Sequence, residues 1–85
     1  MRLAQYGDDH LVSRSQAKRL LARVEKFKIV ILDFTGVTMI GQAFADEVFR
    51  VFARQHPAIE LTAVKATSGV KRMIERARGV RGESA

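Results

Sequence analysis

The sequence predicts an α/β fold, with a small mixed or parallel sheet, helices packed on it and the order β-α-β-α-β-α. Apolar residues recur at helical spacing over residues 14–27, 41–55 and 68–78, and the runs at 29–34 and 59–66 are typical of strands. Because helices alternate with strands, crossover connections and parallel pairing are expected. The chain has 85 residues, which fits a single domain over residues 1–85.

The N-terminal part predicts a short strand and a helix. Residues 2–6 are a candidate strand, ended by turn-forming residues at 7–9. Ser13 is followed three residues later by Gln16, which is the pattern of a capping box at a helix start. A helix over 14–27 would then place five residues on one apolar stripe: Ala17, Leu20, Leu21, Val24 and Phe27.

The middle of the chain predicts a buried strand followed by a helix. Residues 29–34 form a nearly continuous apolar run, which is typical of a strand covered on both faces. Gly36 supplies the turn after it. The next helix is expected to begin around Gly41-Gln42 and to end near Gln55, because Pro57 cannot continue a helix and restricts the residue before it.

The C-terminal part predicts a strand over 59–66 and a third helix. Ser68 is the expected N-cap of that helix, with Val70, Met73, Ile74 and Ala77 on its apolar side. Glycines at 79 and 82 are expected to end it. We expect the tail over 79–85 to be mobile.

The formal net charge is +6. Segments 14–28 and 65–81 each carry +5, from six basic residues against one glutamate, and the rest of the chain carries −4. Two basic helix faces would attract a polyanion, although ordinary solvated helix surfaces explain the same charge and are favoured. The chain has one Tyr and no Trp, so aromatic platforms for stacking bases are scarce. The residues that would contact a nucleic acid are Arg19, Arg23, Lys26, Lys71, Arg72, Arg76 and Arg78.

No pattern of catalytic or metal-binding residues stands out. The chain has no Cys, and His10 and His56 fall in predicted loops without partners at metal or triad spacing. Asp33, at the end of a strand, is either an acid–base group or, as we favour, an acceptor for the following turn. We therefore expect no enzyme, no cofactor and no metal.

We also expect a cytoplasmic protein without membrane contact. The longest unbroken apolar run, Ile29–Leu32, is far too short to span a bilayer. The first ten residues carry charge where the apolar region of a signal peptide would lie.

The string IVILDFTGVTMIGQAFADEVFRVF, residues 29–52, resembles the centre of a STAS domain, the fold of anti-sigma factor antagonists. Residues 11–78 resemble more closely the STAS-like family of unknown function, most specifically at IGQAFADE, residues 40–47. The resemblance implies a regulatory protein that docks a signalling partner, with a histidine-kinase-type ATPase as a candidate. In the antagonists, a phosphorylated Ser or Thr follows an Asp at a helix start. Here Gly41 and Gln42 occupy those two positions, so this phosphate switch is absent.

The favoured hypothesis is a non-enzymatic protein-interaction module that docks its partner through the loop 38–42 and the exposed side of the following helix. The residues assigned to that surface are Thr38, Gly41, Gln42, Asp46, Glu47, Arg50 and Arg54. A nucleic-acid-binding accessory protein is the alternative. A third interpretation is that the chain is part of a longer protein or completes its sheet as a homodimer through an edge strand.

Overall fold

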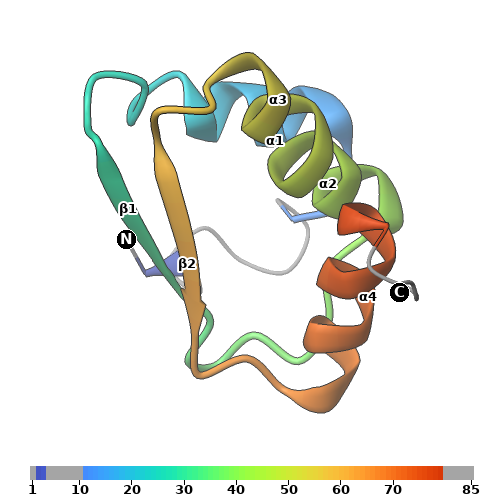
Figure 1. Cartoon of the computed structure of the whole chain (residues 1–85). Coiled ribbons are helices and arrows are strands. Elements are labelled where there is room, and N and C mark those ends of the chain that lie inside the picture. The colour runs from blue at the N-terminus through green and yellow to red at the C-terminus, as the bar shows by residue number, and fades with distance from the viewer. Residues whose placement is uncertain (1, 4–10, 80–85) are drawn as a thin grey trace.

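The computed structural model describes residues 2–3 and 11–79 (Figure 1). In chain order the elements are α1 (Arg14–Leu21), β1 (Ile29–Asp33), α2 (Gln42–Asp46), η3 (Glu47–Phe52), α3 (Ala53–Gln55), β2 (Glu60–Val64) and α4 (Ser68–Arg78). The segments α2, η3 and α3 follow one another without a break. Together they form one helix over residues 42–55, the central helix, in which η3 is π-helical.

The two strands form a parallel sheet, in which Ile29 pairs with Glu60 and Asp33 pairs with Val64. The central helix is the crossover between them, as the alternation of helices and strands predicts. Arg2 also forms a single parallel bridge with Asp33, which agrees with a first strand starting at residue 2. Residues 4–6 of that predicted strand lie outside the described residues.

The helices lie on one side of the sheet, and the central helix contacts both α1 and α4 (Figure 1). On the side of β1 that faces the helices, Val30 and Leu32 are buried. On its other side, Ile29 and Ile31 are 63% and 49% exposed. The prediction that β1 is covered on both faces was therefore wrong for the described residues, because all the helices pack against the same face.

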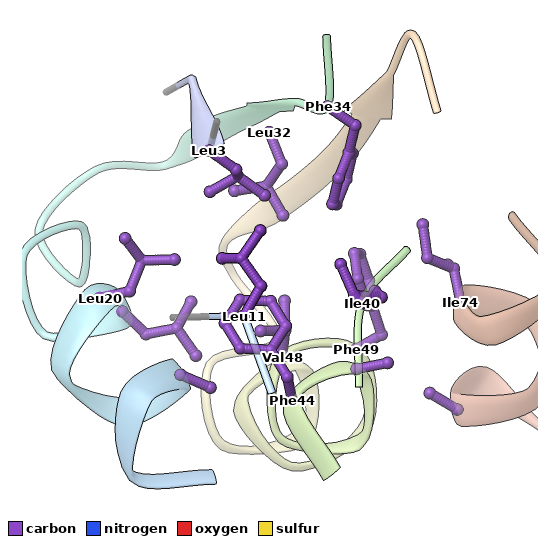
Figure 2. Packing of buried hydrophobic residues seen from close by; sticks show 14 of the residues in the cluster. Leu3, Leu11, Leu20, Leu32, Phe34, Ile40, Phe44, Val48, Phe49 and Ile74 are labelled. Carbon is purple, nitrogen blue, oxygen red and sulfur yellow. The ribbon is translucent and has the colours of Figure 1, made fainter. Parts of the chain in front are cut away.

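The core lies between the sheet and the helix layer. Figure 2 shows Leu32 and Phe34 pointing from the sheet toward Phe44 and Phe49 of the central helix, and all four are buried. Leu20 of α1 and Ile74 of α4 flank this cluster, and Leu3 joins it from the N-terminal segment. One continuous apolar cluster thus connects every layer of the described structure.

The start of α1 was predicted correctly and its end was not. The Ser13 hydroxyl accepts a hydrogen bond from the backbone N–H of Gln16, and the Gln16 side chain accepts one from Ser13 N–H, which completes the capping box. The α-helix ends at Leu21 rather than at residue 27. Tighter turns with i→i+3 hydrogen bonds follow it. Phe27 is consequently displaced from the predicted apolar stripe and is 50% exposed.

The caps of α4 include a second correction. Thr67, and not Ser68, is the N-cap: its hydroxyl accepts a hydrogen bond from Val70 N–H at 3.1 Å. Gly79 ends the helix in the left-handed conformation, with φ of 67°, as its position predicts. The remainder of the predicted tail, residues 80–85, lies outside the described residues. Among the residues that the structure does describe, no helix has the length and apolar character needed to cross a membrane.

Candidate interaction site at the start of the central helix

The loop between β1 and α2 holds two adjacent exposed side chains, Thr38 and Met39, on an anchored backbone. Val37 and Ile40 are buried in the core, whereas Thr38 is exposed and Met39 is 51% exposed. The Thr67 hydroxyl, at the start of α4, donates a hydrogen bond to the Thr38 carbonyl at 3.1 Å. Two buried anchors and one cross-link to α4 therefore fix the position in which Thr38 and Met39 meet solvent.

Asp33 shapes the beginning of this loop. Its Oδ1 accepts hydrogen bonds from Thr35 N–H at 2.9 Å and from the Thr35 hydroxyl at 2.6 Å. The hydroxyl hydrogen bond, followed by the N–H bond, lowers the pKa of Asp33 below its usual value. Gly36 then turns the chain with φ of 84°, a region that favours glycine. These contacts support the turn-acceptor interpretation of Asp33.

Gly41 permits a close approach of two backbone segments. Its N–H donates to the Leu11 carbonyl at 2.8 Å, and Phe44 N–H donates to the Val12 carbonyl at 3.2 Å. A Cβ atom at Gly41 would lie 2.6 Å from the Val12 carbonyl oxygen and 2.8 Å from Val12 Cα. A side chain at this position therefore requires the backbone to move. The role of Gly41 is therefore to let the backbone of residues 11–12 pack against the start of the central helix.

Gln42 is the first residue of α2, and it is exposed. It borders a groove of about 420 Å³ where three helices meet: the start of α1, the first turns of the central helix and the later part of α4. The polar residues that line this groove are Arg14, Gln42, Asp46, Arg50 and Arg76.

Asp46 is the centre of an ion-pair cluster in that groove. Arg50 Nη2 lies 2.8 Å from Asp46 Oδ2, which confirms the i,i+4 pair expected from the sequence. Arg14 Nη1 lies 2.6 Å from the same oxygen. The hydrogen bond from Arg50, with a smaller contribution from Arg14, lowers the pKa of Asp46 to about 2. The same pairing raises the pKa of both arginines.

Glu47 does not have the exposure that its assignment to the docking surface assumed. It is 5% exposed, because α1 packs against this side of the central helix. Arg14 Nη1 lies 3.5 Å from Glu47 Oε1 and provides a counter-charge. The prediction that Glu47 lies on the exposed side of the helix was therefore wrong.

The structure brings some of the assigned residues together and separates others. Gln42, Asp46 and Arg50 share the groove. Arg54 is exposed but follows Gln42 by twelve residues along the helix, roughly 18 Å at 1.5 Å per residue, and does not line the groove. Arg14 and Arg76 do line it. Sequence reasoning missed both for this site, since no local pattern connects them to Asp46.

The alternative nucleic-acid surface is divided in space. All seven of its residues are exposed, as expected. Arg19 belongs to α1, and Arg23 and Lys26 belong to the turns after it, whereas the other four belong to α4. The central helix lies between α1 and α4 (Figure 1). The two basic segments therefore do not form one continuous helix face.

Within the described part of the chain, no group of three or more His, Cys, Asp or Glu side chains is suited to hold a metal ion. The His56 ring packs on Phe52 with centroids 4.5 Å apart, and its Nε2 lies 4.0 Å from Glu25 Oε2. His10 lies outside the described residues.

Comparison with known proteins identifies a family. No curated protein and no solved structure matched the chain. A family model described as a STAS-like domain of unknown function matches residues 16–71, which is more than half of the chain. The match runs from α1 through both strands to the start of α4, and it includes the loop before α2 and all of the central helix. The small parallel sheet with helices agrees with this match, and the chain belongs to the family of STAS-like domains of unknown function.

Proposed function

We propose that this domain is a non-enzymatic regulatory module that docks a signalling protein at the corner surface. We define the corner surface as Thr38, Met39, Gln42, Asp46 and Arg50. Membership of a STAS-like family fits a regulatory module. A histidine-kinase-type ATPase is the candidate partner that the resemblance to anti-sigma factor antagonists implies.

One observation carries the proposal: an apolar side chain, Met39, is 51% exposed on a loop whose backbone is anchored on both sides. Thioether side chains adapt readily to a partner surface. Because Val37 and Ile40 already hold the loop in place, binding would cost little further ordering.

The charged part of the corner surface complements this apolar side chain. Asp46 engages Arg50 and Arg14, so the three side chains have defined positions before a partner arrives. Arranged charges of this kind contribute to specificity and to the rate of encounter.

Docking at this surface is independent of phosphorylation at its centre. Gln42 offers a neutral amide where a phosphate would add about −1.5 to −2 charge near the helix start. The partner is therefore bound constitutively through this position, and any regulation acts elsewhere in the complex.

Site-specific photo-cross-linking tests the proposal. A photoreactive amino acid is placed at Gln42 or, as the matched control, at Gln55, which is exposed at the opposite end of the same helix. We expect a discrete adduct with one regulatory protein from position 42 and none from position 55. The absence of an adduct at position 42, or equal adducts from both positions, would overturn the proposal.

A further inference from the structure

Among the described residues, the backbone groups on the edge of β2 that faces away from β1 have no hydrogen-bond partner. Glu60 N–H donates to the Lys28 carbonyl at 2.7 Å, and Phe34 N–H donates to the Val64 carbonyl at 3.0 Å. In a parallel ladder, alternate residues of a strand bond to the same neighbour. Glu60, Thr62 and Val64 therefore bond toward β1, while the backbone groups of Leu61 and Ala63 point to the opposite edge. Within the described residues, β1 is the only sheet neighbour of β2.

A groove of about 460 Å³ lies along this edge, between β2 and α4. In Figure 1, α4 lies apart from the free side of β2. The apolar residues that line the groove are Leu61, Ala63, Ala66 and Ile74. Ile74 is buried in the core, and the other three are half-buried. The groove thus combines apolar surface with backbone groups that are unpaired among the described residues. An extended peptide that adds to a sheet edge uses both features.

Cations dominate the charged lining of the groove. On α4, Lys71, Glu75 and Arg78 follow one another at i, i+4 and i+7 and share one stripe. Lys65, directly after β2, also lines the groove, so three positive charges stand against one negative charge. The Arg78 guanidinium lies over the Phe49 ring at 5.1 Å, which fixes its position. Among the described residues, Lys71 has no carboxylate partner.

We propose that this groove binds an extended segment of a partner protein in which acidic residues alternate with apolar ones, and that the segment adds to β2 as a further strand. Its backbone pairs with Leu61 and Ala63. Its apolar residues contact Ile74 and Ala66, and its acidic residues are attracted by Lys65, Lys71 and Arg78, whose long side chains line the same groove.

The charge argues for a partner rather than a second copy of this chain. Two copies joined at their β2 edges would bring two cationic stripes of α4 toward each other. Like charges brought together in an interface disfavour it. This surface is distinct from the corner surface, so the inference stands whether or not docking occurs there.

A peptide-binding experiment with the full chain tests the proposal. The probe is a fluorescent synthetic peptide of alternating glutamate and valine, and the control peptide has lysine in place of glutamate. We expect only the acidic peptide to bind, and we expect its affinity to decrease as the NaCl concentration is raised from about 50 to about 300 mM. No change in fluorescence anisotropy at about 1 mM acidic peptide, or equal binding of the lysine peptide, would overturn the proposal.

Amide hydrogen exchange identifies the mode of binding. We expect the acidic peptide to slow exchange at Leu61 and Ala63 and to leave Glu60, Thr62 and Val64 unchanged, since these already bond toward β1. Slowing without this alternation would overturn strand addition. Light scattering shows whether the chain forms a dimer without peptide. If it does, and if exchange at Leu61 and Ala63 is already slow in that dimer, then a second copy of the chain occupies the groove.

Charge reversal on α4 tests the role of the cations. Lys71→Glu should weaken binding of the acidic peptide by at least about tenfold, because it removes one attraction and adds a repulsion. Lys18→Glu makes the same change at an exposed position on α1 and should leave the affinity unchanged. Equal effects of the two variants, both folded by circular dichroism, would contradict the assignment.

Discussion

Gly41 shows how a single residue sets the chemistry available at the start of the central helix. The Val12 carbonyl oxygen would lie 2.6 Å from a Cβ atom at this position. The resemblance to anti-sigma factor antagonists places an aspartate there, and the packing of residues 11–12 leaves no room for one. The departure from the antagonist pattern at Gly41 thus has a structural cause within this chain.

The tight contact at Gly41 predicts a selective loss of stability. Gly41→Ala should lower the free energy of unfolding by about 1–3 kcal/mol, because the backbone of residues 11–12 must shift. Gly69→Ala is the matched control. A Cβ there meets only the flexible end of Met39, at 2.9 Å, and alanine favours the helix. Urea unfolding measures both variants, and an equal or greater loss for Gly69→Ala would contradict this packing argument.

The ion pairs of Asp46 are expected to contribute to the free energy of unfolding in a pH-dependent way. Its pKa in the folded protein is about 2, below the usual value of 3.8. The ion pairs therefore stabilise the fold fully above pH 4 or so, and this contribution disappears as the pH falls toward about 2. Because the pair is at the surface, Asp46→Asn should cost at most about 1 kcal/mol at neutral pH.

Urea unfolding from neutral pH down to about pH 2 checks this expectation. The stability difference between the wild type and Asp46→Asn should vanish at the acidic end. Glu60→Gln serves as a control, since Glu60 is an exposed carboxylate without an ion pair among the described residues. A difference for Asp46→Asn that does not change with pH would show that the ion pairs contribute nothing.

Single residues also mark the limit of what the sequence predicts. The pair of Asp46 with Arg50 follows from helical spacing, and it was confirmed. The pair of Asp46 with Arg14 joins positions 32 residues apart, so no local pattern encodes it. The burial of Glu47 has the same origin, because it depends on which side of the central helix α1 covers.

At the scale of elements, helix boundaries marked by a local pattern were predicted more closely than the end of α1. The capping box at Ser13 is a local pattern, and it was confirmed. The end of α1 at Leu21 has no glycine or proline to signal it, and the helical spacing continues in the sequence to Phe27. The sequence pattern likewise does not predict the π-helical segment η3, since the same residues fit the spacing of an ordinary α-helix.

The start of α4 predicts a difference between two adjacent hydroxyl residues. Thr67→Ala should lower the free energy of unfolding by about 0.5–2 kcal/mol, because it removes the N-cap of α4. It also removes the hydrogen bond to the Thr38 carbonyl. Ser68→Ala should have little effect, since Ser68 lies inside the helix. Thermal unfolding compares the two, and a larger loss for Ser68→Ala would contradict the assignment of the cap.

At the scale of the molecule, the one-sided helix layer decides what is exposed. The sequence correctly predicted a small α/β fold with a parallel sheet. It did not reveal that Ile29 and Ile31 stay exposed, because a continuous apolar run indicates a strand but not how many helix layers cover it. The same layer separates the two basic segments, whose relative position the sequence left open.

This separation predicts weak binding of nucleic acids. We expect duplex DNA to bind at about 50 mM salt without sequence preference and to dissociate near about 200 mM, because few phosphates can be contacted at once. Mobility-shift assays at the two salt concentrations measure this. Binding that persists at the higher concentration and is weakened by Arg72→Ala would favour the nucleic-acid function instead.

The affinity of the cross-linked partner for two glutamine variants tests the docking proposal most directly. Gln42→Arg places a large cation in the corner surface, and Gln55→Arg makes the same change at the other end of the central helix. Calorimetry with the purified partner should show Gln42→Arg weakening binding by at least about tenfold, with Gln55→Arg unchanged. Equal affinities for the two folded variants would contradict docking at the corner surface.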